Sequence, residues 1–356
     1  MESGGTKNKI RLVLSPSAEK YARQDAPLKV RKIAARGALP LEALDLATLL
    51  FALSHDPDAE VQQTARASLA DLPEKILEAT LSGPAHPALL AHLARIHKDD
   101  DAACEALALN PATSDLTIAF LASLPLRSVV EIVSNNQERL QRESRIVEAL
   151  GENPLTGRAV VERILSFLGI PLGKEDVDAA TLEPTEEEAT RAVLAVLGDQ
   201  SVETAKILAS EEESPEEETT DNIFAAIQKM SVMEKIKLAR IGGKEARNLL
   251  IKDRNKVVAL SALQSPKITD TEVVSIAQSR SVSDEILRMI SSNKDWTRNY
   301  QIKLALTTNP KTPLPQAVKF LNYLQDRDLR ALMKSKDVSS AISSHARRIL
   351  DKKGLV

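Results

Sequence analysis

Cysteine, aromatic residues and glycine are all scarce in this chain of 356 residues. Cys104 is the single cysteine, so the chain can form no internal disulfide and no metal site built from several thiolates. Aromatic residues make up 3% of the sequence, and 12 glycines are few for a protein of many hairpins or phosphate-binding loops. These shortages favour a core in which Leu, Ile, Val and Ala pack helix on helix.

Long apolar runs are also missing. No stretch of about 18 apolar residues occurs, which argues against a membrane span. The N-terminal sequence has neither a continuous apolar segment nor a small-residue cleavage site, so it does not resemble a secretory signal. Together with the single cysteine, these absences predict a cytoplasmic protein that does not enter membranes.

Motifs of catalysis and of cofactor binding are absent as well. His86, His92 and His97 are separated by six and five residues, whereas a zinc-binding helix needs a spacing of four. No phosphate-binding loop, nucleophile elbow or metalloprotease motif is present. Cys104 lies among Ala and Leu residues and is expected to be a packed thiol. We therefore assign no catalytic, cofactor-binding or metal-binding residue and expect a protein that is not an enzyme.

Charge is distributed unevenly, although the net charge is only −3. Residues 1–36 hold nine basic and three acidic side chains, and residues 171–221 hold three basic and sixteen acidic ones. Residues 222–356 hold twenty-five basic and twelve acidic side chains. Such an excess of basic residues attracts phosphate groups or acidic proteins, so the C-terminal part of the chain is the main candidate for binding.

An internal duplication is the strongest pattern that the sequence does contain. The segments 127–156 and 280–312 both begin with Arg-Ser-Val, continue through two helical patterns and end with Asn-Pro-x-Thr. Pro111 and Pro266 are 155 positions apart, and Pro154 and Pro310 are 156 apart, so the spacing is kept with small insertions only. We interpret this as a duplication of helical repeats.

The Asn-Pro-x-Thr motif predicts a helix boundary. Asparagine tolerates the left-handed conformation that ends many helices, and the following proline cannot continue the helix. The threonine is then expected to cap the next helix. A looser copy begins at Ser265-Pro266, where Thr269 and Glu272 have the spacing of a capping box.

These short repeats, rich in Leu, Val and Ala and punctuated by Asn-Pro, resemble the HEAT-like and leucine-rich repeat variant families of bacterial helical-repeat proteins. Residues 56–73 show an Asp-Pro turn before a helix with apolar residues at Val61, Ala65 and Leu69, as in a HEAT-type repeat. The resemblance implies an all-α fold, an α-solenoid with two related arrays of short repeats. Some repeat-variant proteins carry a cysteine-rich iron–sulfur segment, which is lacking here, so no cofactor is implied.

The predicted organisation has four parts. They are a basic N-terminal extension (1–36), a first repeat array (37–170), an acidic linker (171–221) and a second, basic array (222–356). Within the linker, residues 186–197 and 201–208 have enough apolar residues for a helical hairpin, with Thr185 and Glu188 spaced as a capping box. This hairpin either caps the first array or stands apart.

The predicted function is that of a scaffold or adaptor whose repeat surface binds another protein. The alternative is nucleic-acid binding through residues 222–356, with the acidic linker as an internal competitor. A third possibility, activity like that of the HEAT-like DNA glycosylases, depends on Asp295 beside Trp296. The basic residues can also be no more than the solvated faces of helices. The candidate binding surface comprises Lys244, Arg247, Lys252, Arg254, Lys256, Trp296, Arg298, Lys303, Lys311, Arg327, Arg330, Lys334, Lys336, Arg347 and Arg348.

Overall fold

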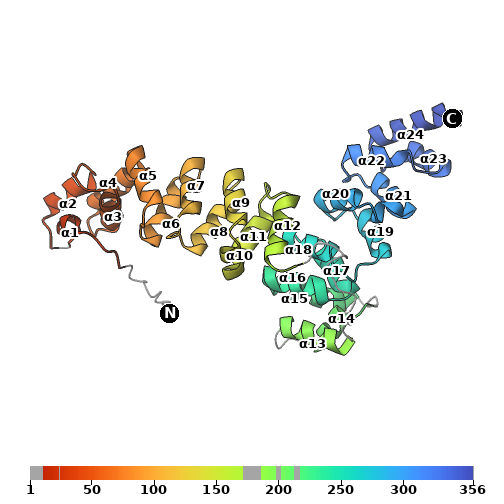
Figure 1. The fold of residues 1–356 in the computed structure, drawn as a ribbon, viewed down its shortest axis with the longest axis horizontal. Coiled ribbons are helices and arrows are strands. Elements are labelled where there is room, and N and C mark those ends of the chain that lie inside the picture. The colour runs from red at the N-terminus through yellow and green to blue at the C-terminus, as the bar shows by residue number, and fades with distance from the viewer. Residues whose placement is uncertain (1–10, 24, 171–185, 198–201, 212–216, 356) are drawn as a thin grey trace. The chain divides into compact units, whose positions relative to one another are not determined.

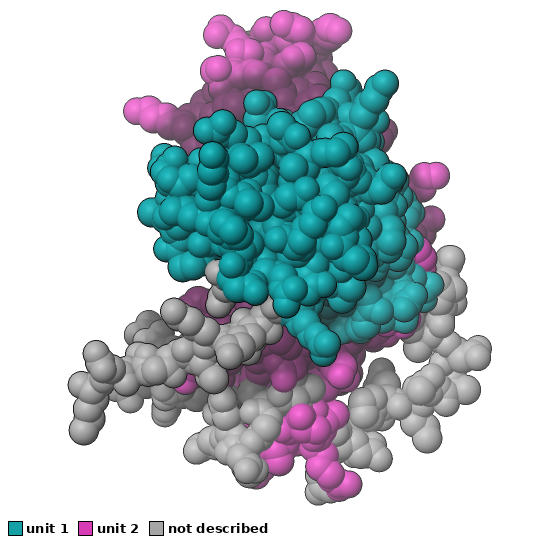
Figure 2. All heavy atoms as spheres, turned by 90° about the vertical axis from the view of Figure 1, so that its left-hand side faces the viewer, with its two compact units in different colours: residues 1–156 teal, residues 157–356 magenta. Residues whose placement is uncertain are grey.

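The computed structural model describes residues 11–23, 25–170, 186–197, 202–211 and 217–355 (Figure 1). Within these ranges the chain forms the α-helices α1 to α24, one 3-10 helix and no strand, which confirms the all-α class. Two compact units divide the chain, unit 1 with residues 1–156 and unit 2 with residues 157–356 (Figure 2). Each unit is described by itself.

Unit 1 holds eleven of the described helices. They are α1 (Pro16–Ala22), α2 (Leu28–Ala35), α3 (Ala43–Leu53), α4 (Ala59–Ala70), α5 (Glu74–Ser82), α6 (Pro87–Ile96), α7 (Asp101–Leu109), α8 (Asp115–Ser123), α9 (Arg127–Ser134), α10 (Gln137–Arg142) and α11 (Ser144–Glu152). Helices α3, α5, α7 and α9 contact one another in succession, as do α6, α8 and α11. The unit is thus built from two rows of helices, and short turns connect one row with the other.

The residues predicted as an N-terminal extension contribute to the core of unit 1. Ser15 caps α1, and Pro16 is its first residue. Ala18 of α1 and Ala35 of α2 are fully buried in a cluster with Leu49 of α3 and other apolar residues. Two basic side chains of α2 bind carboxylates of the next helix pair: Arg31, which is largely buried, pairs with Asp56, and Lys32 pairs with Glu60. Residues 1–10 of this predicted extension lie outside the described residues.

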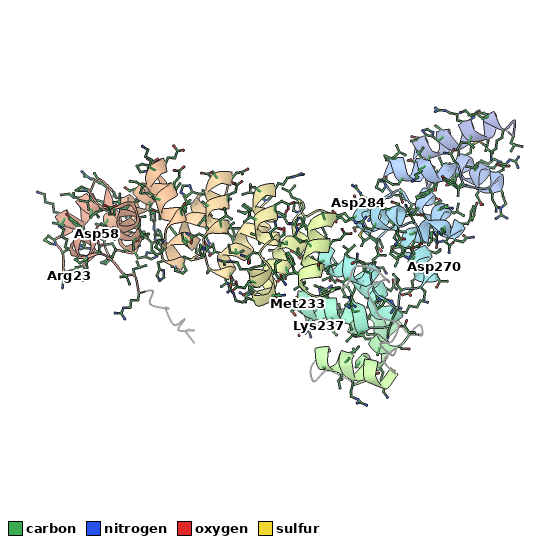
Figure 3. All side chains as sticks on the ribbon, in the orientation of Figure 1. Arg23, Asp58, Met233, Lys237, Asp270 and Asp284 are labelled. Carbon is green, nitrogen blue, oxygen red and sulfur yellow. The ribbon has the colours of Figure 1, made fainter. Side chains whose placement is uncertain are left out.

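Helix α4 has the predicted pattern of apolar residues on one face. Val61, Ala65 and Leu69 are fully buried, as expected from their spacing on one helix face. Asp58 (Figure 3) caps the helix, because its carboxylate accepts hydrogen bonds from the backbone N–H groups of Glu60 and Val61.

Unit 2 holds the other thirteen described α-helices and the 3-10 helix. They are α12 (Arg158–Phe167), α13 (Glu186–Leu197), α14 (Val202–Ala209), α15 (Glu217–Lys229), α16 (Val232–Ile241), α17 (Lys244–Leu250), α18 (Lys256–Leu263), α19 (Asp270–Gln278), α20 (Asp284–Ser292), η1 (Trp296–Arg298), α21 (Tyr300–Thr308), α22 (Leu314–Leu321), α23 (Asp326–Lys334) and α24 (Ser340–Lys352). Again two rows are present: α16, α18 and α20 form one, and α17, α19 and α21 form the other.

The predicted linker hairpin exists as α13 and α14, and it packs on unit 2 rather than on the first array. Helix α13 contacts α16, and α14 contacts α17. Helix α12, which the sequence placed in the first array, packs against α18 and is grouped with unit 2. Helix α15 begins at Glu217, within the predicted acidic linker. Residues 212–216 of that linker and Thr185 of the predicted capping box lie outside the described residues.

The asparagines of the Asn-Pro-x-Thr motif connect neighbouring helices of one row. The Asn309 amide follows α21 and donates to the carbonyls of Ala277 and Ser279 at the end of α19, at 2.8 and 2.9 Å. In unit 1, Asn153 makes the same pair of bonds to the end of α8, and Asn110 makes them to the end of α5. Carbonyls at helix ends have no partner within their helix, so these bonds satisfy them.

The boundary chemistry predicted for this motif is wrong in two respects. All three asparagines are extended, with φ of −72°, −66° and −76°, and no described non-glycine residue has a positive φ. The next residue is proline, which favours extended backbone before it, so no left-handed turn is needed. Nor does the threonine cap: Thr113 donates back to Leu107 O, Ser114 caps α8, and Pro313 rather than Thr312 precedes α22. The capping box of Thr269 with Glu272 is confirmed.

The Arg-Ser-Val match at the start of the duplication does not mark equivalent positions. Arg127 is the first residue of α9, whereas Arg280 precedes α20, which begins at Asp284. The buried positions correspond instead: Val129, Val130 and Val133 in α9 have the spacing of Ile286, Leu287 and Ile290 in α20. Burial, rather than residue identity, therefore aligns the two segments.

Candidate interaction surfaces

Arg247 is the one predicted surface residue that lies in the core. Its side chain in α17 is 2% exposed and bonds to three groups. Its Nε and Nη2 donate to the Glu272 carboxylate at 2.9 and 3.2 Å, its Nη1 donates to Gly242 O, and its Nη2 donates to Glu211 at 2.6 Å. Arg247 thus stabilises unit 2 and belongs to no exposed binding surface.

The charges of this cluster reinforce one another. Burial acts to lower the pKa of Arg247, but the hydrogen bonds with Glu211 and Glu272 outweigh it, so the pKa is raised. Burial acts to raise the pKa of Glu272, yet the bonds from Arg247 and Thr269 hold that pKa below its ordinary value of 4.5. Both groups therefore remain charged over the physiological pH range.

The end of α14 packs very closely on the turn between α16 and α17. The N–H of Gly243 donates to Leu208 O at 2.7 Å. A Cβ at Gly243 would lie 1.7 Å from Ser210 O, so only glycine fits there. Together with the bond from Arg247 to Glu211, this contact fixes α14 on unit 2. Gly242 and Gly243 form the turn between α16 and α17.

The other predicted surface residues separate by exposure. Lys244, Lys256, Trp296 and Lys303 are partly buried. The remaining ten are exposed, namely Lys252, Arg254, Arg298, Lys311, Arg327, Arg330, Lys334, Lys336, Arg347 and Arg348. Because these residues come from several loops and helices of unit 2, the structure divides them into separate groups.

One group occupies the loops between helices α17 and α18, α19 and α20, and α21 and α22. Lys256 pairs with Glu285 of α20 at 3.1 Å, next to Asp284 (Figure 3), and the Lys311 ammonium donates to Val282 O at 3.1 Å. Arg280 pairs with Asp337 at 3.3 Å. Several of these basic side chains thus bind groups on neighbouring loops or helices. Fewer of them remain available to bind a ligand.

A second group lies on α23. Arg327, Arg330 and Lys334 follow the three- and four-residue spacing of one helix face, and Leu329 and Leu332 are buried on the other side. Beside this face is a groove of about 300 Å³, lined by Gln278, Gln301, Leu304, Ala305, Thr308, Asp328, Ala331, Leu332 and Ser335. We call Arg327, Arg330 and Lys334 the α23 basic face.

The residues around Trp296 do not converge on one point. Trp296 lies in η1 and is partly buried. Asp295 pairs with Arg298 at 3.2 Å, and both side chains are about 80% exposed (80% and 81%). The Tyr300 hydroxyl instead donates to Asp328 of α23 and accepts from the N–H of Gln325. The carboxylate of Asp295 therefore lies in solvent, outside any described pocket.

Unit 1 has an exposed apolar face on α8, which the sequence analysis did not single out. Leu116 is 55% exposed. Ala119 and Phe120 are partly buried, and Ser123 is exposed. Together these four residues form a stripe along the helix, opposite the buried Thr117, Ile118, Leu121 and Ala122. We call Leu116, Ala119, Phe120 and Ser123 the α8 apolar face. The sequence shows apolar residues on several sides of α8, but it does not indicate which of them remain exposed.

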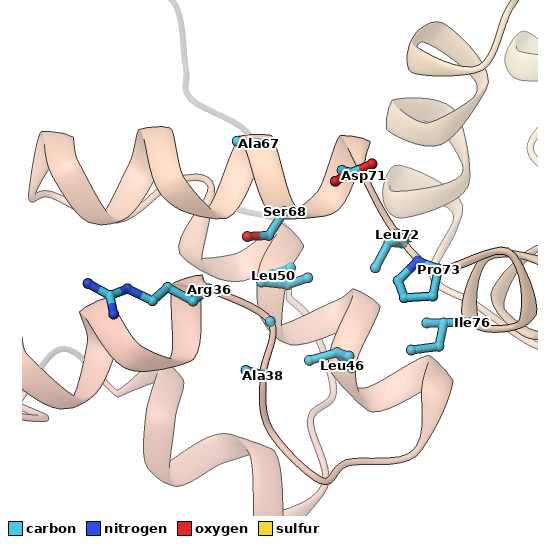
Figure 4. Close-up of a pocket in the computed structure, with 11 residues that line it drawn as sticks. Arg36, Ala38, Leu46, Leu50, Ala67, Ser68, Asp71, Leu72, Pro73 and Ile76 are labelled. Atoms are coloured by element: carbon cyan, nitrogen blue, oxygen red, sulfur yellow. The ribbon is translucent and has the colours of Figure 1, made fainter.

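Unit 1 also contains a hollow of about 440 Å³ between α2, α3, α4 and α5 (Figure 4). Its inner wall is apolar and includes Leu46 and Leu50 of α3, which are buried. Arg36 and Asp71, both exposed, lie at its rim on the ends of α2 and α4 (Figure 4). These two charges form no ion pair with each other, and the lining of the hollow has no convergent set of polar groups.

The described part of the chain has neither a candidate metal site nor a reactive thiol. No group of three or more His, Cys, Asp or Glu side chains there could hold a metal ion. Burial, assisted by Asp100 and its neighbours, raises the pKa of Cys104 to about 11, and the thiol donates to His97 O at 3.4 Å. This is a packed, protonated thiol, as predicted.

No described helix has the length and apolar content needed to cross a lipid bilayer. In comparisons with known proteins, no family model, no curated protein and no solved structure matched this chain.

Proposed function

We propose that this chain is a non-enzymatic scaffold that binds another protein through the surface of a HEAT-like α-solenoid. Two rows of helices in each unit, and the same asparagine bonds at equivalent helix ends, support two related arrays. Such an array has a continuous core and leaves its helix faces free for recognition. A cytoplasmic location, which the single buried cysteine favours, is part of the proposal.

The observation that carries the proposal is the α8 apolar face. Helix α8 is already packed on its other side, so the exposed Leu116 beside Ala119 and Phe120 does not contribute to the stability of the fold. Protein interfaces, by contrast, have an apolar centre surrounded by polar residues. Arg95 of α6 and Glu148 of α11, which flank α8 in its row, are exposed and suit such a rim.

The test compares two exposed leucines of unit 1. Leu116→Glu places a charge in the α8 apolar face, whereas Leu109→Glu places the same charge at the end of α7, where Leu109 is 68% exposed. In quantitative pull-downs from the native cell, partners should be lost at least tenfold with Leu116→Glu and kept with Leu109→Glu. Equal recovery with both variants, or no protein enriched with the unaltered chain, would refute the proposal.

Nucleic-acid binding is the second candidate, and the exposed lysines and arginines of unit 2 favour it. Binding of a DNA duplex by the full chain would then weaken steeply as salt increases, because neutralised phosphates release counterions. Substitution of Lys252 and Arg254 by Gln would remove about two phosphate contacts. The slope of log affinity against log salt concentration would then become shallower by about 2. A duplex that fails to bind in low salt would remove this candidate.

A further inference from the structure

The α23 basic face has charges that the protein does not use internally. Both carboxylates of α23 have cationic or hydroxyl partners: Asp326 accepts from the ammonium of Lys353 at 2.6 Å, and Asp328 accepts from the Tyr300 hydroxyl. Arg327 lies 3.6 Å from the Asp328 carboxylate, whereas Arg330 and Lys334 have no ion pair among the described residues. Positive charge on this face is therefore available to a ligand.

The groove beside this face offers a different kind of contact. Ala305 of α21 and Leu332 of α23 form a buried apolar base, and Leu304 is partly exposed beside them. The remaining lining is uncharged except for Asp328, whose carboxylate is occupied by Tyr300. A hollow of about 300 Å³ has room for one or two apolar side chains.

The two features are adjacent on one helix. On α23, Ala331 lines the groove and is four residues from Arg327 and three from Lys334, so these side chains are neighbours on the helix surface. A ligand seated in the groove would therefore bring its outer groups close to the α23 basic face. Apolar anchors combined with carboxylates at helical spacing are what an acidic amphipathic helix presents to such a surface.

We propose that the groove between α21 and α23, together with the α23 basic face, binds an acidic amphipathic segment of a partner protein. This inference rests on the proposed scaffold function and names the partner's chemistry. A nucleic-acid backbone fits less well, because its phosphates make no use of an apolar groove and would meet Asp326 and Asp328 beside the cations. Exposed ion pairs are individually weak, so we expect fast exchange and sensitivity to salt.

The test uses the full chain and a fluorescein-labelled peptide of 14 residues in which Leu anchors alternate with Glu at helical spacing. Fluorescence anisotropy in low salt should show binding, and a matched peptide with Gln in place of Glu should bind at least tenfold more weakly. The double variant Arg330→Gln, Lys334→Gln should weaken binding of the acidic peptide about tenfold. Ala331→Leu, which fills the groove without changing charge, should also weaken it severalfold.

The control variant is Arg347→Gln, Arg348→Gln on α24, which removes the same charge from two exposed arginines elsewhere in unit 2. It should leave binding unchanged. An equal loss with this control would mean general attraction between opposite charges and would overturn the proposal. So would the absence of peptide binding, or tighter binding of a 20-base-pair duplex with the same dependence on Arg330 and Lys334. None of these outcomes affects the Leu116→Glu test of the scaffold itself.

Discussion

At the residue scale, a few buried polar side chains hold the helix rows together. The Asn309 amide contacts two carbonyls of α19, and its Oδ1 accepts from the N–H of Lys311. Arg139 has a similar role in unit 1, where its guanidinium donates to Asn110 O, Thr113 O and the Asp115 carboxylate. Such groups join elements that the apolar core alone would leave free to slide.

Replacing Asn309 by Ala should destabilise unit 2 by about 2–4 kcal/mol, because a buried and a partly buried carbonyl lose their partners. The matched control is Asn299→Ala at the other end of α21, where the side chain only caps the helix, and about 1 kcal/mol is expected. Urea unfolding followed by circular dichroism measures both. Equal losses would contradict the role of Asn309 between helices.

Acid should weaken the Arg247 cluster. The pKa of Glu272 is depressed in the folded chain, so its contribution is fully present above the ordinary value of 4.5 and is lost as pH falls through the lower folded-state pKa. Glu272→Gln should destabilise the protein by about 3 kcal/mol near pH 7, and it should flatten the decline of stability below pH 4.5.

The control for this prediction is Glu285→Gln, which removes a partly exposed partner of Lys256 and should cost less than about 1 kcal/mol. Unfolding free energies measured between pH 3 and pH 7 test the difference. Parallel pH profiles for Glu272→Gln and the unaltered chain would show that Glu272 contributes nothing to acid sensitivity.

At the element scale, the position of α14 depends on a glycine. Gly243→Ala would place a Cβ 1.7 Å from Ser210 O, so α14 must move away from α17. Hydrogen exchange of residues 202–209 should become at least tenfold faster, while α18 and α19 keep their protection. Gly157→Ala is the control, because no atom lies within 4 Å of the added Cβ, and it should change exchange in α14 by less than twofold.

Helix α18 shows why unit 2 must include α12. Every residue of α18 from Val257 to Leu263 is buried, and α12 packs against it through a helix with Val160, Val161, Ile164 and Leu165 buried. No amphipathic pattern could have revealed this arrangement, because a helix that is apolar on all sides does not indicate which neighbours cover it.

At the scale of the whole molecule, unit 2 should fold on its own only when the fragment includes α12. The fragment 157–356 should be a folded monomer, whereas 171–356 lacks α12 and should bind a hydrophobic dye and associate, because α18 is uncovered. Size-exclusion chromatography and dye fluorescence distinguish them. Two fragments with the same elution volume and the same urea midpoint would disprove a role for α12 in covering α18.

The sequence by itself determined the helices. The spacing of Val61, Ala65 and Leu69 predicted α4, and Thr269 with Glu272 predicted the cap of α19. Such signals are local, since a helix face or a cap depends on residues within four positions of one another. The ends of α21 and α11 were predicted for the same reason, although the asparagine conformation was not.

Only the tertiary structure decided which surfaces remain available. Arg247 and Arg330 look alike in sequence, yet one is buried against Glu211 and Glu272 and the other is exposed on α23. The difference arises from partners 25 and 36 residues away, which no local pattern can indicate. The α8 apolar face likewise became visible only once its neighbours were in place, because exposure is a property of packing and not of composition.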